Sequence, residues 1–156
     1  MDYGNVLKSF VERTRINLNH IEKSQKEGVD VYETTQLINS CLGLLVLPQQ
    51  KFLKKIPAKY IAELEREGWP IPRVSDKYKK VTTLYQLVTK IRNAITHFNI
   101  RFIVDHKNEI SAIRIWNKNH KGRKNWEGFF TVNDLKKFVE MFSNLLLSYY
   151  SSRFFC

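Results

Sequence analysis

The stretch Leu84–Phe98 constrains the fold of this chain most strongly, because its apolar residues recur with the period of an α-helix. At about 100° per residue they form one stripe, made of Leu84, Leu87, Val88, Ile91, Ile95 and Phe98. Asn93 and His97 are i,i+4 neighbours on the opposite face, and Arg92 flanks the stripe. We therefore predict a helix that packs its stripe inward and presents an amide and an imidazole outward.

Helical patterns cover most of the chain. The expected helices run from Asp2 to about Lys26, from Asp30 to Leu47, from Ala58 to Glu67, from Ser75 to about Phe98, and from Thr131 onward. Asp30, Ser75 and Thr131 are the expected N-caps, since their side-chain oxygens can accept from free helix amides. Within the second helix, Gly43 would permit close approach of a neighbouring helix.

After His97 the period of the apolar residues changes from 3.6 to 2. Residues 100–116 predict a β-hairpin, and Glu127–Phe130 predicts a third short strand. Between them, Asn117–Asn125 has no apolar residue, so we expect an exposed loop. The predicted fold class is mainly α: a bundle of four to five helices, with a small β-hairpin or three-stranded sheet inserted between the motif helix and the C-terminal helix.

Two tryptophans, Trp116 and Trp126, flank this basic segment. Aromatic rings interleaved with cations can stack on unpaired bases, and equally they can pin a hairpin to the helices. We favour the structural role for Trp116, and for Trp126 both roles stay open.

Arg92-Asn93-x-x-x-His97 resembles the Arg-(polar)-x-x-x-His signature of the HEPN family, the higher eukaryote and prokaryote nucleotide-binding domains. The resemblance implies one HEPN-like helical bundle over residues 1–156. It also implies a metal-independent ribonuclease that works as a dimer, in which the motifs of two protomers face each other across a cleft. Such proteins occur in toxin–antitoxin and phage-defence systems.

The motif residues suit RNA cleavage without a metal. Histidine titrates near neutral pH and can transfer protons, whereas arginine stays charged and offers a planar fork to phosphate. Asn93, one turn before His97, could orient the imidazole or bind phosphate. One histidine cannot conveniently act as base and acid in one step, but a two-fold dimer supplies two. The candidate catalytic residues are therefore Arg92, Asn93 and His97, contributed by each protomer.

Five further residues are candidates for binding the substrate: Thr96, Lys90, Lys121, Arg123 and Lys124. Each also has a structural interpretation, since cations on exposed faces are usually only solvated. The cluster Lys51–Lys59 could likewise steer RNA or form a solvated loop. A histidine near a helix C-terminus can simply favour the helix dipole, and an arginine beside an apolar stripe can snorkel.

The formal net charge of +11 favours polyanionic partners. Nucleic acid, an anionic membrane surface and an acidic protein are all compatible, and we favour RNA because no basic amphipathic anchor stands out. Cys41 is expected to be a buried hydrophobe, and with Cys156 it makes no disulfide scaffold, which favours a reducing cytosol. The apolar runs are too short to span a bilayer, so we expect a cytoplasmic protein. No histidine spacing resembles a zinc site, so we expect no metal and no cofactor.

The favoured hypothesis is a HEPN-type endoribonuclease that acts as a homodimer, a toxin or phage-defence effector with a possible antitoxin or regulatory partner. The alternative is a non-catalytic HEPN-like module that binds RNA, nucleotide or an acidic partner. A third possibility is a subunit of a larger complex, in which a different chain covers the polar face.

Overall fold

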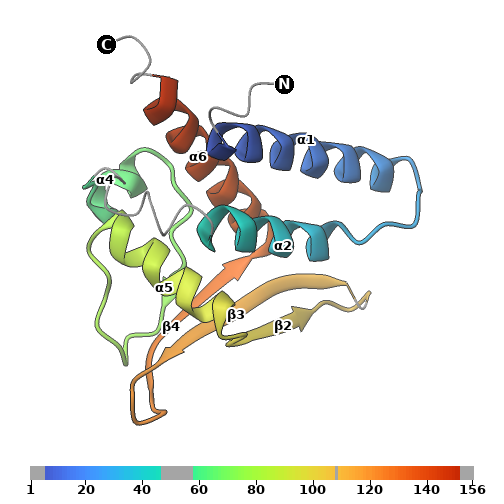
Figure 1. The fold of residues 1–156 in the computed structure, drawn as a ribbon. Helices are drawn as coiled ribbons and strands as arrows, with labels where there is room; N and C mark the ends of the chain where they lie inside the picture. The colour runs from blue at the N-terminus through green and yellow to red at the C-terminus, as the bar shows by residue number, and fades with distance from the viewer. Residues whose placement is uncertain (1–5, 47–57, 108, 152–156) are drawn as a thin grey trace.

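The computed structural model describes residues 6–46, 58–107 and 109–151. In this part of the chain the helices are α1 (Val6–Lys26), α2 (Glu33–Val46), α4 (Ile61–Arg66), α5 (Leu84–Thr96) and α6 (Val132–Ser151). The strands are β1 (Arg73–Val74), β2 (Ile100–Val104), β3 (Ile110–Lys118) and β4 (Lys124–Thr131). They form one sheet of order β1-β4-β3-β2, in which every pair is antiparallel. Figure 1 shows the helices gathered on one side of this sheet.

Helices α1, α2 and α6 pack against one another and form the helical layer. Gly43 on α2 allows the close approach that its sequence position suggested, because a Cβ there would lie 2.7 Å from the ring of Phe10 on α1. Lys136 of α6 also reaches both other helices, at 2.7 Å from Glu22 and 3.6 Å from Glu33. Cys41 is buried in this layer, as predicted, and burial raises the pKa of its thiol.

Helix α5 contacts α2 on one side and β3 on the other, and α6 also packs directly on β3 and β4 (Figure 1). The sheet contributes Ile113, Ile115, Trp126 and Phe130 to the common core. Among the described residues, no helix is long and apolar enough to cross a membrane.

The fold is mainly helical, as predicted, but the sheet is larger than predicted. Its fourth strand, β1, precedes the motif helix and pairs with β4 through Arg73 with Phe129 and Val74 with Gly128. The sheet is therefore not simply inserted between the motif helix and the C-terminal helix. A two-residue strand has no periodicity of its own, which is why no sequence pattern predicted it.

Two predicted helix starts were wrong. Helix α2 begins at Glu33, so Asp30 lies ahead of it and is not its cap. Helix α5 begins at Leu84, where the Thr83 hydroxyl accepts from the Gln86 amide at 3.3 Å. Ser75 lies in the extended segment instead, where its amide donates to the Glu127 carbonyl at 3.2 Å, and an antiparallel bridge between Tyr60 and Thr83 keeps the chain extended at the start of α5.

Other predicted boundaries were closer. The short helix expected over Ala58–Glu67 is α4, and Thr131 caps α6 by accepting from the Asp134 amide at 3.0 Å. The hairpin over residues 100–116 is confirmed as β2 and β3, and the third strand as the longer β4. The predicted ends of the first two helices at Asp2 and Leu47 lie outside the described residues.

Candidate active site

The apolar stripe of α5 fixes which way its polar residues face. Five of its six predicted members are buried: Leu84, Leu87, Val88, Ile91 and Ile95. Helix α2 and strand β3 cover this stripe. On the opposite side of α5, Tyr85 and Thr96 are exposed and Asn93 is half-buried. The sequence therefore predicted the orientation of the motif helix correctly.

The sixth member, Phe98, was placed wrongly, because the helix ends before it. The Phe98 amide donates to the Ile95 carbonyl at 2.9 Å and the Asn99 amide to the Ala94 carbonyl at 2.8 Å. These two bonds form a Schellman motif, in which the residue after the C-cap takes a left-handed conformation. Phe98 accordingly has φ 50° and is 74% exposed.

His97 is the C-cap residue of α5, with φ −93° and ψ 8°, and its side chain is exposed. Its amide donates to the Asn93 carbonyl at 3.1 Å, which fixes the backbone but leaves the imidazole at the helix end. The imidazole is therefore accessible to a substrate or to a second protein chain.

Arg92 lies one turn earlier, and its environment differs from that of His97. The residue is half-buried, and its Nε is a buried donor with no hydrogen-bond partner in the described structure. Burial lowers the pKa of Arg92 below its ordinary value, and nearby Tyr85 opposes that shift. No described carboxylate forms an ion pair with Arg92. An unpaired, partly desolvated guanidinium is a strong binding site for an anion, because an incoming oxygen accepts from the free N–H and compensates the charge.

The other predicted residues on α5 divide into two groups. Asn93 is half-buried and Thr96 is exposed, and both belong to the same open side as His97. Lys90 is half-buried, and its backbone carbonyl accepts from the side-chain amide of Asn117 on β3 at 2.8 Å. Arg92 and His97 lie about 140° apart around the helix axis at 100° per residue, and no hydrogen bond joins their side chains in the described structure.

Asn117 is a positioning residue that the sequence did not reveal. It was assigned to an exposed loop over Asn117–Asn125, but it is buried and pairs with Trp126 across β3 and β4. Its hydrogen bond ties the sheet to the backbone of the motif helix two residues before Arg92. A lone asparagine beside a basic segment has no sequence pattern that could indicate this role.

A family model described as HEPN pEK499 p136 matches residues 1–153 of the chain. The chain belongs to the HEPN family. The match confirms the resemblance that rested on Arg92, Asn93 and His97, and it extends over almost the whole sequence. No curated protein and no solved structure matches the chain.

Three of the predicted basic residues of this HEPN protein lie where β3 turns into β4: Lys121 and Arg123 on the turn, and Lys124 at the start of β4. Lys121 and Arg123 are exposed there, on a turn held by the Asn119 side chain, whose Oδ1 accepts from both of their amides at 3.0 Å. Lys124 is more constrained, because its Nζ lies 2.9 Å from Glu127 and 4.5 Å from the ring centre of Trp116. Only Lys121 and Arg123 are therefore fully available to a phosphate.

Sheet register brings this turn to the motif end of the HEPN domain. The Trp116 amide donates to the Asn99 carbonyl at 3.1 Å. The end of β3, at Lys118, therefore lies close to Asn99, which follows His97 by two residues. Of the two tryptophans, Trp126 is fully buried and thus structural, and Trp116 is half-buried beneath Lys124.

The remaining candidates contribute little to this HEPN site. His20, His106 and His120 are exposed and lie on α1, the β2–β3 turn and the β3–β4 turn. Within residues 6–46, 58–107 and 109–151, no three His, Cys, Asp or Glu side chains gather where they could hold a metal ion. Lys59 forms an ion pair with Glu67 at 2.6 Å, and the rest of the Lys51–Lys59 cluster lies almost entirely outside the described residues.

Proposed function

We propose that this HEPN protein is a metal-independent endoribonuclease whose active site is composed on the two-fold axis of a homodimer. The observation that carries the proposal is the state of Arg92, a half-buried cation without a carboxylate partner and with an unsatisfied Nε. It lies on the same open helix as an exposed imidazole at His97. A phosphodiester supplies the anion that Arg92 lacks. Its cleavage requires proton transfers, for which the imidazole of His97 is suited.

The chemistry follows from these two side chains. The 2′-hydroxyl of RNA attacks the adjacent phosphorus while one neutral His97 takes its proton. The bond from phosphorus to the 5′-oxygen breaks, and a protonated His97 of the partner subunit gives that oxygen a proton. Arg92 holds the non-bridging oxygens, where negative charge grows in the transition state. The products are a 2′,3′-cyclic phosphate and a 5′-hydroxyl.

A dimer would support this reaction because Arg92 and His97 diverge around α5 within one chain. A two-fold contact through the open side of α5 presents the same patch on both sides, so it doubles each group around one cleft. Asn93 and Thr96 on that side would orient the imidazole or contact the phosphate. In a cell, such an enzyme would act as a toxin or phage-defence effector in the cytoplasm, restrained by an antitoxin or other regulatory partner.

The alternative function is a HEPN module that binds RNA, nucleotide or an acidic partner without turnover. The separation of Arg92 from His97 in one chain favours it, because an isolated guanidinium suffices for binding. A third arrangement, in which a different chain covers the open side of α5 within a larger complex, would likewise remove the composite site.

Labelled RNA incubated with purified protein in EDTA separates these possibilities. We expect cleavage in chelator, with a cyclic phosphate on the 5′ fragment. Arg92→Lys keeps the charge but loses the planar fork, so cleavage should fall at least about ten-fold. Arg13→Lys, the same exchange on the exposed surface of α1, is the matched control and should have no effect. RNA that shifts in mobility but stays intact would establish the binding module.

A further inference from the structure

The side of the sheet that faces away from the helices bears a row of arginines. Register pairs Arg73 with Phe129, Phe129 with Arg114, and Arg114 with Arg101, so these four residues occupy one row across β1, β4, β3 and β2. Directly opposed residues of a sheet point to the same face. Neighbouring strands lie about 4.8 Å apart, so the row spans about 14 Å.

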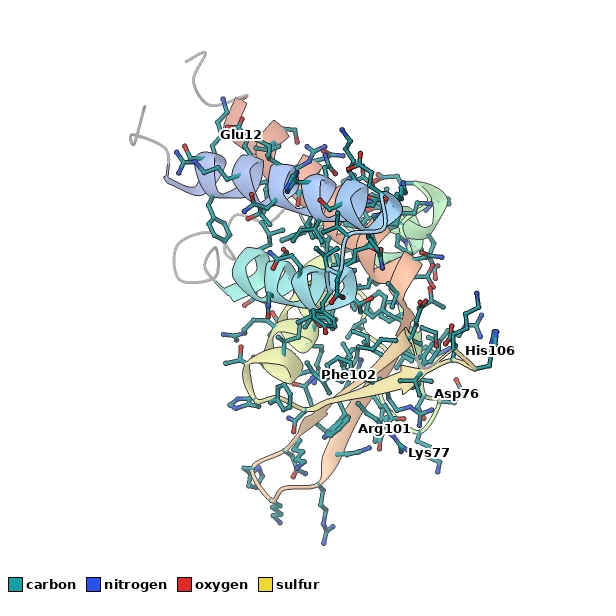
Figure 2. The ribbon with its side chains drawn as sticks, turned by 90° about the vertical axis from the view of Figure 1, so that its right-hand side faces the viewer. Glu12, Asp76, Lys77, Arg101, Phe102 and His106 are labelled. Atoms are coloured by element: carbon teal, nitrogen blue, oxygen red, sulfur yellow. The ribbon has the colours of Figure 1, made fainter. Side chains whose placement is uncertain are left out.

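Contacts and burial identify which face this is. The residues in the two neighbouring rows, Ile113 with Phe130 and Ile115 with Gly128, are buried toward the helices. The three arginines of the row are exposed. Figure 2 shows the same division on β2, with Phe102 on the helix side and Arg101 on the other. No helix covers the outer face in Figure 1.

The outer face is strongly basic. Arg114 lies 3.6 Å from Glu127, which also pairs with Lys124 at 2.9 Å, so one carboxylate serves two cations. Arg73 and Arg101 have no ion-pair partner in the described structure. Two of these four cations therefore share one carboxylate and the other two have none, so the arginine row attracts a polyanion.

The same face contains aromatic surface and a hollow. Phe129 is half-buried and lies between Arg73 and Arg114 in the row. These three residues, with Glu127, line a hollow of about 320 Å³. An arginine fork matches a phosphate, and a phenyl ring offers a surface on which an unpaired base can stack. This alternation fits single-stranded nucleic acid better than an acidic polypeptide, which would use the cations alone.

We propose that this arginine row binds the backbone of single-stranded RNA and holds the substrate outside the cleavage position. This inference rests on the proposed function, because the RNA that the row binds is the substrate of the proposed ribonuclease. Arg101 follows His97 by four residues, so the end of the row lies within about 14 Å of the motif. An RNA strand crossing the sheet from β1 to β2 therefore leaves it at the edge strand that directly follows the motif helix.

The test measures binding separately from cleavage. A short, fluorescein-labelled, 2′-O-methylated RNA has no 2′-hydroxyl to attack with, so the unmodified protein binds it without cutting it. Its anisotropy is followed with the parent chain and with the double variant Arg73→Gln/Arg101→Gln over a range of salt concentrations. Both residues are exposed and unpaired, so this exchange should leave the fold intact.

We expect the double variant to weaken binding about ten-fold or more. The slope of log K against log salt should fall by about 1.4, because each single-strand phosphate contact contributes about 0.7. The matched control is Arg13→Gln/Lys23→Gln, which removes the same charge from α1, on the far side of the helical layer (Figure 1). An equal loss of affinity and slope in both double variants would overturn the proposal.

Two further probes identify the occupant. Phe129→Leu keeps apolar bulk but removes the ring, so RNA binding should weaken about ten-fold while an abasic strand binds as before. If polyglutamate binds as tightly as RNA and is equally sensitive to Arg73→Gln/Arg101→Gln, the face takes an acidic protein and the RNA assignment fails. If the protein cleaves RNA but the arginine row contributes nothing to RNA binding, this inference is wrong and the proposed function stands. If the row binds RNA but the protein does not cleave it, the proposed ribonuclease activity is wrong and this inference stands.

Discussion

Phe98 has a backbone conformation that phenylalanine rarely adopts, with φ 50°, at the residue that ends the Schellman motif. Glycine usually occupies this position, since a β-carbon there costs about 1–2 kcal/mol. The side chain gains little from packing, because it is 74% exposed. Phe98→Gly should therefore stabilise the fold by about 1 kcal/mol, measured as a higher midpoint of urea unfolding.

Phe98→Ala is the control for that prediction. Alanine removes the ring but keeps the β-carbon, so it retains the strain and should not stabilise the fold. Equal midpoints for the Gly and Ala variants would show that the left-handed conformation costs nothing here.

Asn117 is the residue through which the sheet positions the motif helix. Its side-chain amide is buried and donates to the Lys90 carbonyl at 2.8 Å. Asn117→Ala should lower the free energy of unfolding by about 1–3 kcal/mol, because the bond is lost and a small void is left. Asn125→Ala, at an exposed position on β4, should change it little. Similar losses in both variants would mean that the contact with α5 has no special weight.

Phe98 and Asn117 are two residues whose burial could not be predicted from the sequence. The apolar period continues through Phe98, and only the two hydrogen bonds of the helix end reveal that the residue turns outward. Asn117 lies in a run of polar residues, but β3 extends through it because β4 offers a partner at Trp126. Both outcomes depend on backbone pairing, which side-chain periodicity does not encode.

At the scale of elements, the sequence predicted the helices and strands whose apolar residues recur regularly, and it missed the boundaries that depend on pairing with another segment. The stripe of α5 and the alternation around β3 are long enough to identify a buried face. The N-cap of α5 was misplaced by eight residues, from Ser75 to Thr83, because Ser75 extends the β1–β4 pairing and Thr83 pairs with Tyr60. Register across the sheet, which assembles the arginine row, is likewise a property of four strands together.

The contact of α1 with α6 makes a prediction about pH. Hydrogen bonds from Lys136 and then Lys26 lower the pKa of Glu22. A carboxylate with a lowered pKa stabilises the fold above its unfolded pKa of about 4.3, and this contribution is lost as the pH falls through the folded value. Glu22→Gln should therefore lower stability at pH 7 by about 0.5–1 kcal/mol, since the group is partly exposed, and its difference from the parent should vanish toward pH 2.

Thermal unfolding of the two proteins between pH 2 and pH 7 measures this difference. Glu12→Gln, an exposed exchange on the same helix (Figure 2), is the control and should have a smaller effect. A constant gap between Glu22→Gln and the parent across the whole pH range would contradict the assigned role of Lys136.

At the scale of the molecule, the proposed enzyme depends on a dimer through the open side of α5. Tyr85 lies on that side and is 46% exposed. Tyr85→Asp places a charge in the predicted interface, so light scattering should show the mass falling from two chains to one, and RNA cleavage should fall with it. Tyr32→Asp, at a position 76% exposed between α1 and α2, should leave both unchanged. A parent protein that is a stable monomer would remove the composite site.

The whole-molecule prediction from sequence was correct in family and in helical character, and incomplete in topology. The six-residue motif was enough to indicate a HEPN domain, which the family model confirms over residues 1–153. The net charge of +11 indicated a polyanion, but charge alone cannot say which face receives it. The arginine row that we propose as this face is formed only when strands far apart in sequence are aligned in one sheet.

The most direct test of the central claim is cleavage of RNA in EDTA by the parent protein, His97→Ala and His20→Ala. His20 is an exposed histidine on α1, far from the motif, so its variant is the matched control. We predict that the parent and His20→Ala release fragments with 2′,3′-cyclic phosphate and 5′-hydroxyl ends. His97→Ala should be at least about 100-fold slower, because proton transfer is lost. Cleavage by His97→Ala at the parent rate, or RNA left intact by the parent protein, would contradict the account.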